Sequence, residues 1–209
     1  MEVLKDWNFW LSIVTITATI IALFQTSRQI KLSNRQSLFD RRISLIIYAK
    51  TIYCLLGNSR SSLEKRKEGV QFGIAIPFCE ITNSSIFEEM ANVVSNPLKQ
   101  PFHRSFLAKK EEIVSKSYEI KMVFKKDDAN DLSCLLVCYS ELLQSMYKYI
   151  IALSDMEKYK NEPSFDYKNW EPELEQRADL FSKIKEAYEA FDNIKKRNLF
   201  AQLEKEIKL

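Results

Sequence analysis

The chain has 209 residues, of which 46% are hydrophobic and only three are glycine. This is enough apolar material for the core of one domain, whereas so little glycine disfavours a turn-rich β fold, so we expect an all-α protein. The net charge of +3 is nearly balanced, which does not indicate a nucleic-acid-binding surface, and no nucleic-acid partner is expected.

The first feature in chain order is a charge-free run over residues 7–27 (WNFWLSIVTITATIIALFQTS). A helix of this length covers about 31 Å, close to the roughly 30 Å core of a bilayer. We interpret residues 8–27 as a transmembrane helix and residues 1–7 as a short tail, with Trp7 and Trp10 in an interfacial aromatic belt. The alternatives are a buried core helix and a cleaved signal peptide, although the tail is not basic and no typical cleavage site follows.

The charges on the two sides of this run predict its orientation. Residues 1–7 carry two acids and one base, whereas residues 26–56 carry six basic side chains and one acid. Basic flanks stay in the cytoplasm, so we expect the N-terminus outside and residues 28–209 inside as a helical domain. The nearest basic residues are expected at the membrane interface, where they either bind anionic lipid or act only as a topology signal. They are Arg28, Lys31 and Arg35.

Hydroxyl groups inside the run allow two interpretations. Ser12, Thr15 and Thr19 lie on one helix face, where contacts between hydroxyls help membrane helices associate. The same hydroxyls can instead return hydrogen bonds to the preceding turn of their own helix. The first interpretation predicts a homo-oligomer and the second a single span.

Beyond the span, the helix is expected to continue as a stalk, since no proline or glycine occurs before Gly57. Leu38, Leu45 and Ile52 recur every seven residues and predict an apolar face that packs on the domain. Gly57 is expected to end this helix. Residues 60–69 (RSSLEKRKEG) are expected to form a solvated loop, although their basic side chains could touch lipid or an acidic partner.

The next segments predict a connector and two helices. Residues 70–82 alternate like a strand, but no partner strand is evident, so we expect an apolar connector rather than an edge strand. Ser85 and Glu88 have capping-box spacing and predict a short helix that ends near Ser95. Residues 101–126 are expected to form a longer helix, because their apolar side chains recur every four or seven positions.

The C-terminal half predicts two more helices. Residues 131–160 form the most apolar soluble helix and are expected at the centre of a bundle. Glu141 and Lys148 disfavour a second span, because a central charge costs about 2.5–3.5 kcal/mol on insertion scales. Residues 161–172 are expected to form a linker, and residues 172–208 a final helix of about 50 Å that could project and pair with another chain.

Few residues support catalysis. Three glycines cannot form a phosphate-binding loop motif, and His103 is the only histidine. Cys134 and Cys138 share a helix face and could supply half a zinc site. Cys54 and Cys79 would have to complete it, but cysteines in apolar settings are usually core residues. We therefore expect no enzyme activity, no cofactor and no metal.

Three acidic residues lie between the two central helices. Asp127, Asp128 and Asp131 could gather a cation. A break between helices followed by an N-cap explains them better, because aspartate is favoured at both places.

The segment after the span carries a family resemblance. Residues 36–43 (QSLFDRRI), with Tyr48 five residues further on, resemble a segment that follows the single N-terminal span of uncharacterised bacterial membrane proteins, some of which are encoded near phage-defence genes. The resemblance implies an inner-membrane setting and a role in antiviral defence, and it carries no catalytic residues. An amphipathic stalk without a special function explains the same residues. The stalk-packing residues would be Leu38, Phe39, Asp40 and Arg42.

Two functional hypotheses follow from these features. In the first, the chain is a membrane-tethered helical module that binds a protein partner and localises or senses it, in the setting of phage defence. In the second, it is a membrane-disrupting effector that acts when its transmembrane helices assemble into an oligomer. A metal-dependent enzyme that uses the cysteines is a remote third hypothesis.

Overall fold

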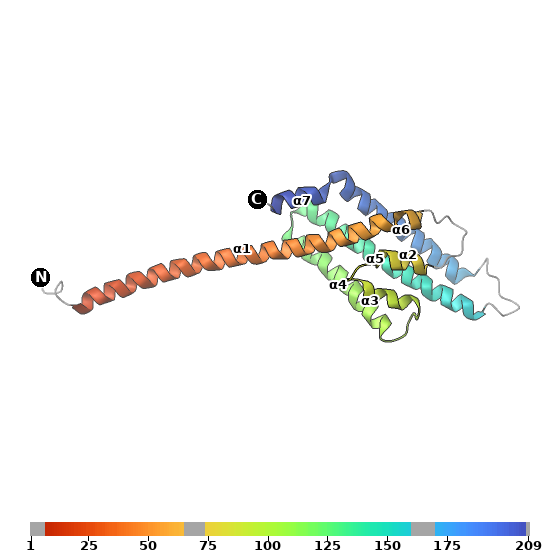
Figure 1. Ribbon diagram of the computed structural model, residues 1–209, viewed down its shortest axis with the longest axis horizontal. Helices are drawn as coiled ribbons and strands as arrows, with labels where there is room; N and C mark the ends of the chain where they lie inside the picture. Colours follow the sequence, from red (N-terminus) through yellow and green to blue (C-terminus); the bar gives the residue numbers. More distant parts are fainter. Residues whose placement is uncertain (1–6, 65–73, 160–169, 208–209) are drawn as a thin grey trace. The chain divides into compact units, whose positions relative to one another are not determined.

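In the computed structural model every regular element of the described residues is a helix, which confirms the expected all-α fold (Figure 1). The chain divides into two compact units between Ile43 and Ser44. The tail and most of the linker predicted from the sequence lie outside the described residues. The structure describes residues 7–64, 74–159 and 170–207.

The second unit is organised around one long central helix. This helix, α5, contacts both α4 and α6. Its fully buried Tyr139 donates a 2.6 Å hydrogen bond to the carbonyl of Ile81, which satisfies the phenol inside the core. Of the described residues, only α1 is long and apolar enough to cross a membrane, so α5 is a bundle helix and not a second span. The elements are α1 (Trp7–Glu64), α2 (Ala75–Ile81), α3 (Glu88–Ala91), the 3-10 helix η2 (Asn92–Val94), α4 (Phe102–Val123), α5 (Lys126–Tyr159), α6 (Glu171–Arg197) and α7 (Leu199–Ile207).

Helix α1 does not end at Gly57, as the sequence suggested, but continues to Glu64. A Cβ at Gly57 would lie 3.4 Å from Cε2 of Phe191 on α6, which is an ordinary van der Waals contact, so the ring packs against the helix at this position. Ring packing here, including Tyr53 stacked on Phe191 at 4.3 Å, offsets the roughly 1 kcal/mol that glycine costs a helix. The solvated loop expected over residues 60–69 is therefore wrong for 60–64, and 65–69 lie outside the described residues.

Residues 75–81 form the short helix α2, so the strand alternative is wrong there. The preferred connector does pack on its neighbours, since Phe78 and Ile81 are fully buried, but it does so as a helix. A helix satisfies its backbone groups internally, whereas a strand without a partner cannot. The amide of Phe78 donates to the carbonyl of Ile74 at 3.0 Å.

The predicted capping box at Ser85 and Glu88 is wrong. Helix α3 starts at Glu88 after Phe87, and no side chain caps it. Phe87 is fully buried with its ring 5.5 Å from that of Tyr139, so aromatic packing sets this turn. The amide of Ile86 instead donates to Oγ of Ser84 at 3.2 Å.

The predicted break between the central helices is shorter than expected. Helix α4 ends at Val123, close to the expected end, and α5 begins at Lys126 rather than at residue 131. Asp127 and Asp128 occupy the first turn of α5, where the positive end of the helix dipole favours carboxylates.

The final helix is not continuous. It breaks at Asn198, which has a left-handed φ of 49°, a conformation that asparagine tolerates better than most residues. Leu199 and Leu203 of α7 are then buried in the core. The prediction of a projecting helix over 172–208 is therefore wrong. The bend at Asn198 directs Leu199 and Leu203 into the core instead.

Candidate membrane span and docking groove

The N-terminal part of α1 exposes its side chains on all sides. Every residue over 7–42 is exposed, with Phe24 at 75% and Val14 at 64%. No side chain in the apolar window is buried, which argues against the buried-core alternative. Large exposed apolar surfaces are typical of membrane or protein contact. By length and composition this helix is a candidate membrane span.

The hydroxyls of this helix bond within it. Oγ of Ser12 donates to the carbonyl of Asn8 at 2.9 Å, and Thr15 and Thr19 each donate to the carbonyl four residues earlier at 2.8 Å. The return-bond interpretation is confirmed, because the hydroxyl protons are used inside the helix. Association of spans through this face stays a prediction.

The predicted interface residues are exposed at both ends of the charge-free run. Trp7 and Trp10 lie at its start, and Arg28, Lys31 and Arg35 follow its end. Their contact with lipid stays a prediction.

The expected stalk packing begins later than predicted. Leu38 and Phe39 are 40% and 42% exposed and do not enter the described core. Asp40 and Arg42 are also exposed. The buried face of α1 starts at Leu45, just after the boundary between the two units.

Within the second unit, a groove of about 400 Å³ runs along the exposed side of α1. Ile47, which lines this groove, is 57% exposed. The one charged side chain that lines the groove is that of Lys50, whose Nζ donates a 2.5 Å hydrogen bond to Glu204. A second groove of about 510 Å³ shares Asn83 and Ser84 with it. Each groove has one charged lining residue, Lys50 in the first and Glu88 in the second. The first, which we call the α1 groove, is lined by Ile47, Lys50, Thr51, Cys54, Leu55, Asn58, Asn83 and Ser84.

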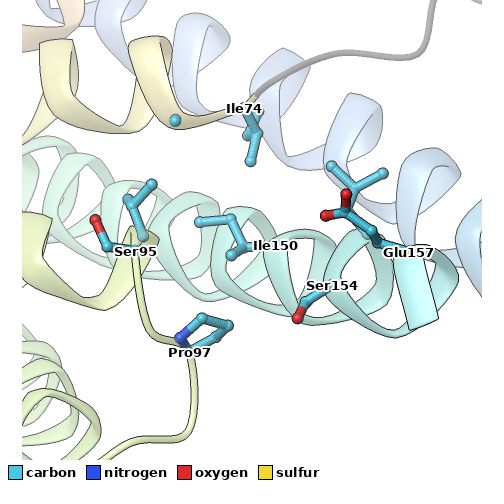
Figure 2. A pocket seen from close by; sticks show the side chains of 9 residues that line it. Ile74, Ser95, Pro97, Ile150, Ser154 and Glu157 are labelled. Atoms are coloured by element: carbon cyan, nitrogen blue, oxygen red, sulfur yellow. The ribbon is translucent and has the colours of Figure 1, made fainter.

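Another pocket, of about 270 Å³, lies between the end of α5 and the segment around η2 (Figure 2). Ile150 and Pro97 line its middle, and its polar groups come from Ser95, Ser154 and Glu157. Two hydroxyls and one carboxylate, without a histidine or lysine among the lining residues, do not form a nucleophile activated by a base.

The single histidine takes part in a structural contact. Nδ1 of His103 lies 2.6 Å from the hydroxyl oxygen of Tyr147, which also accepts a 3.2 Å hydrogen bond from the amide of Leu98. Tyr147 is buried, with its ring 4.5 Å from that of Phe106. These contacts tie the segment before α4 to α5.

The structure brings two of the four cysteines together. Sγ of Cys134 and Sγ of Cys138 are 3.8 Å apart, and burial together with Cys134 raises the pKa of Cys138 to about 12. Cys54 and Cys79 are exposed on other elements. No group of three or more potential ligands in the described part of the chain could hold a metal ion.

The acidic cluster faces a cation from the chain itself. Arg197, at the end of α6, donates to carboxylate oxygens of Asp131 and Asp128, the latter at 2.8 Å. The guanidinium therefore links the end of α6 to the start of α5. It lies beside the acidic residues for which a bound cation was one of the two interpretations of the sequence.

No protein-family model, curated protein or solved structure matches the chain.

Two buried or half-buried ionic contacts were not predicted. Glu173 is 2% exposed and accepts a 2.7 Å hydrogen bond from the hydroxyl of Tyr149. Burial raises the pKa of Tyr149 most, and this hydrogen bond raises it further. Arg60, expected in a solvated loop, donates to both carboxylate oxygens of Asp192 at 2.7 and 3.1 Å. Each contact joins residues far apart in the sequence, so no local pattern could have indicated it.

Proposed function

We propose that this chain is a membrane-tethered helical interaction module. One observation carries the proposal: α1 is a single helix whose first part is charge-free and exposed, and whose last part contributes to the core of the helical unit. A partner captured by the helical unit would thereby be held at a membrane. The more basic flank after the span supports an N-terminus outside and a helical unit in the cytoplasm.

The tether is tested by fractionation of cells that express the full chain. We expect the chain to stay in the membrane pellet after an alkaline carbonate wash, and a variant that lacks residues 1–27 to be released. Release of the full chain by the wash would contradict the tether.

The orientation is tested with the exposed thiol of Cys134. A membrane-impermeant maleimide is expected to label it only after the inner membrane is opened. The chain used for labelling retains Cys134 and has serine in place of the other three cysteines, and the control is the same chain with Cys134 also replaced by serine. Equal labelling in intact spheroplasts would place the helical unit on the opposite side.

The docking surface we propose is the α1 groove, since Ile47, Cys54 and Leu55 give it apolar surface and Lys50 is its one charged lining residue. A photoreactive amino acid in place of Cys54 should cross-link a partner protein in cells. The same group in place of Lys185, which is 78% exposed on α6, is the control and should not. Equal cross-linking at both positions would contradict a specific groove.

The defence setting of the proposal is supported by the resemblance of residues 36–43. In that setting the module would act as a sensor or an accessory component, and cells with the chain should resist phages that infect cells without it. A Cys54→Arg variant, which places a charge in the groove, should abolish resistance while it stays in the membrane. Resistance that survives this variant would separate defence from the groove.

The second candidate function, a membrane-disrupting effector, is favoured by the hydroxyl face of the span. Ser12, Thr15 and Thr19 recur at helical spacing, and their oxygens still have lone pairs that can accept contacts from a neighbouring span. Expression of the full chain should then depolarise cells, whereas a chain without residues 57–209 should not. An unchanged membrane potential would leave the tethered module as the proposal.

A further inference from the structure

We infer that one face of α1, formed by Arg28, Lys31 and Arg35, binds the headgroups of anionic phospholipids and holds them on one side of the span. This inference rests on the proposed membrane tether. It goes beyond the tether, because a span alone requires no particular lipid and a topology signal requires no particular face.

The three cations share one side of the helix. At 3.6 residues per turn, positions 28, 31 and 35 fall within about 60° of one another around the axis. All three are exposed. The one acid in the described residues 7–43, Asp40, lies about 180° around the helix from Lys31. The other side of this segment carries uncharged Gln29, Ser33, Gln36 and Ser37.

The axial positions place these charges beside a membrane surface. With Ser27 at the edge of the hydrocarbon core, Arg28 and Lys31 lie about 1.5 and 6 Å beyond it. The headgroup layer of one leaflet is about 5–8 Å thick. Arg35, about 12 Å beyond the core, is still within a Debye length of about 8 Å from that layer.

The direction of helical side chains brings them closer still. The Cα–Cβ bonds of an α-helix tilt toward its N-terminus, which in α1 is the end that carries the span. The long stems of Arg28, Lys31 and Arg35 therefore extend back toward the membrane, where they can lie along apolar surface with the charge among phosphates. A bidentate guanidinium matches the geometry of a phosphodiester.

The same helix provides a matched negative control. Arg42 lies on the same face as Arg35, but about 22 Å beyond the edge of the core, which is more than a Debye length past the headgroups. Its neighbour Arg41 is equally distant. Loss of these two charges changes the net charge as much as loss of Arg28 and Lys31, without removing charge from the headgroup layer.

The test is native mass spectrometry of the full chain in nonionic detergent, with equal amounts of phosphatidylglycerol and phosphatidylcholine added. We expect adducts of phosphatidylglycerol to dominate. The R28Q/K31Q variant should reduce the phosphatidylglycerol preference by about 5- to 25-fold, which is about fivefold for each cation near an anionic surface. R35Q alone should reduce it less, and R41Q/R42Q by less than about twofold.

An unchanged preference in R28Q/K31Q, or an equal loss in R41Q/R42Q, would overturn the inference. Retention of each variant in carbonate-washed membranes is measured in parallel. Variants that lose the lipid preference but stay in the membrane support the headgroup site, and variants that keep both contradict it. Release of the wild-type chain by carbonate would contradict the tether itself, so the two failures are distinguishable.

Discussion

Two stretches of α1 share one backbone geometry and differ in everything that surrounds them. Over residues 7–42 every side chain is exposed, whereas over residues 45–63 one face is buried against the rest of the helical unit. Within the first stretch, the charge-free surface of residues 7–27 is complementary to hydrocarbon. In the second, apolar residues alternate with polar ones that bond to other helices. The second stretch is thus stabilised by tertiary packing, whereas we propose that lipid surrounds the charge-free part of the first.

Because the two stretches have different surroundings, a substitution in one should change a different free energy from a substitution in the other. In the span that we propose within the exposed stretch, the free energy that depends on a side chain is that of transfer into the bilayer. In the packed stretch, it is the free energy of unfolding of the helical unit. Substitutions that affect only one of these quantities test the comparison.

The largest effect is expected from charges in the middle of the span. Ile16→Arg combined with Ile20→Arg should cost about 5–7 kcal/mol of insertion, because each central arginine costs about 2.5–3.5 kcal/mol. The variant should appear in the soluble fraction after a carbonate wash. The thermal unfolding of the helical unit should not change. The control, Ile16→Leu with Ile20→Leu, should stay in the membrane, and retention of the arginine variant would contradict a bilayer span.

Truncation of a core ring should lower the stability of the helical unit without releasing the chain from the membrane. Phe87 is fully buried between Tyr48 and Tyr139, with ring centroids at 5.7 and 5.5 Å. Phe87→Ala should destabilise the helical unit by about 3–5 kcal/mol, measured by urea unfolding, and leave the chain in the membrane. Phe24→Ala, on the exposed stretch, is the control and should leave unfolding unchanged. Equal effects of both substitutions would remove the distinction between the stretches.

A smaller effect is expected where a buried carboxylate depends on one hydroxyl. Tyr149→Phe removes the 2.7 Å hydrogen bond to Glu173, whose carboxylate also lies 3.8 Å from Nε of Arg177. We expect a loss of about 1.5–3 kcal/mol in the free energy of unfolding. Tyr118→Phe, at a 59% exposed position, should be neutral. A neutral Tyr149→Phe would show that water replaces the lost donor.

The elements that periodicity alone predicted are those whose signal is local. The apolar spacing of α4 and α5 and the charge-free run of α1 can be read within one segment. Helix α4 was predicted close to its bounds, whereas α5 begins five residues before its predicted start and ends close to its predicted end. The apolar positions spaced by seven on α4 form its buried face, since Phe106, Ile113 and Ile120 are fully buried.

The errors fall where a distant partner decides. Gly57 continues a helix because Phe191 packs on it, and Asn198 ends one because Leu199 and Leu203 are buried beyond it. The α1 groove could not be predicted at all, because residues 47–58 and residues 83–84 meet only in the folded chain. Sequence patterns indicated the candidate membrane span, but not the groove in which we propose that a protein partner docks.

The smallest effect concerns the pair that joins α1 to α6. Arg60 and Asp192 are 33% and 36% exposed, so Arg60→Gln should cost only about 0.5–1 kcal/mol at neutral pH. The hydrogen bond from Arg60 lowers the pKa of Asp192. The ionic contribution is therefore full above the unfolded carboxyl pKa of about 3.9 and is lost as the pH falls through the lower folded value.

Wild type and Arg60→Gln should accordingly converge in stability as the pH falls below about 4. A difference that persists at low pH is expected from contacts that do not titrate, such as the guanidinium 5.2 Å from the ring of Tyr188 and 5.7 Å from that of Phe191. The control is Lys185→Gln, which removes a 3.9 Å pair on the exposed side of α6 and should be neutral at every pH. A difference between wild type and Arg60→Gln that does not vary with pH would assign the whole contribution of Arg60 to packing. The join between α1 and α6 would then depend on the aromatic rings and not on charge.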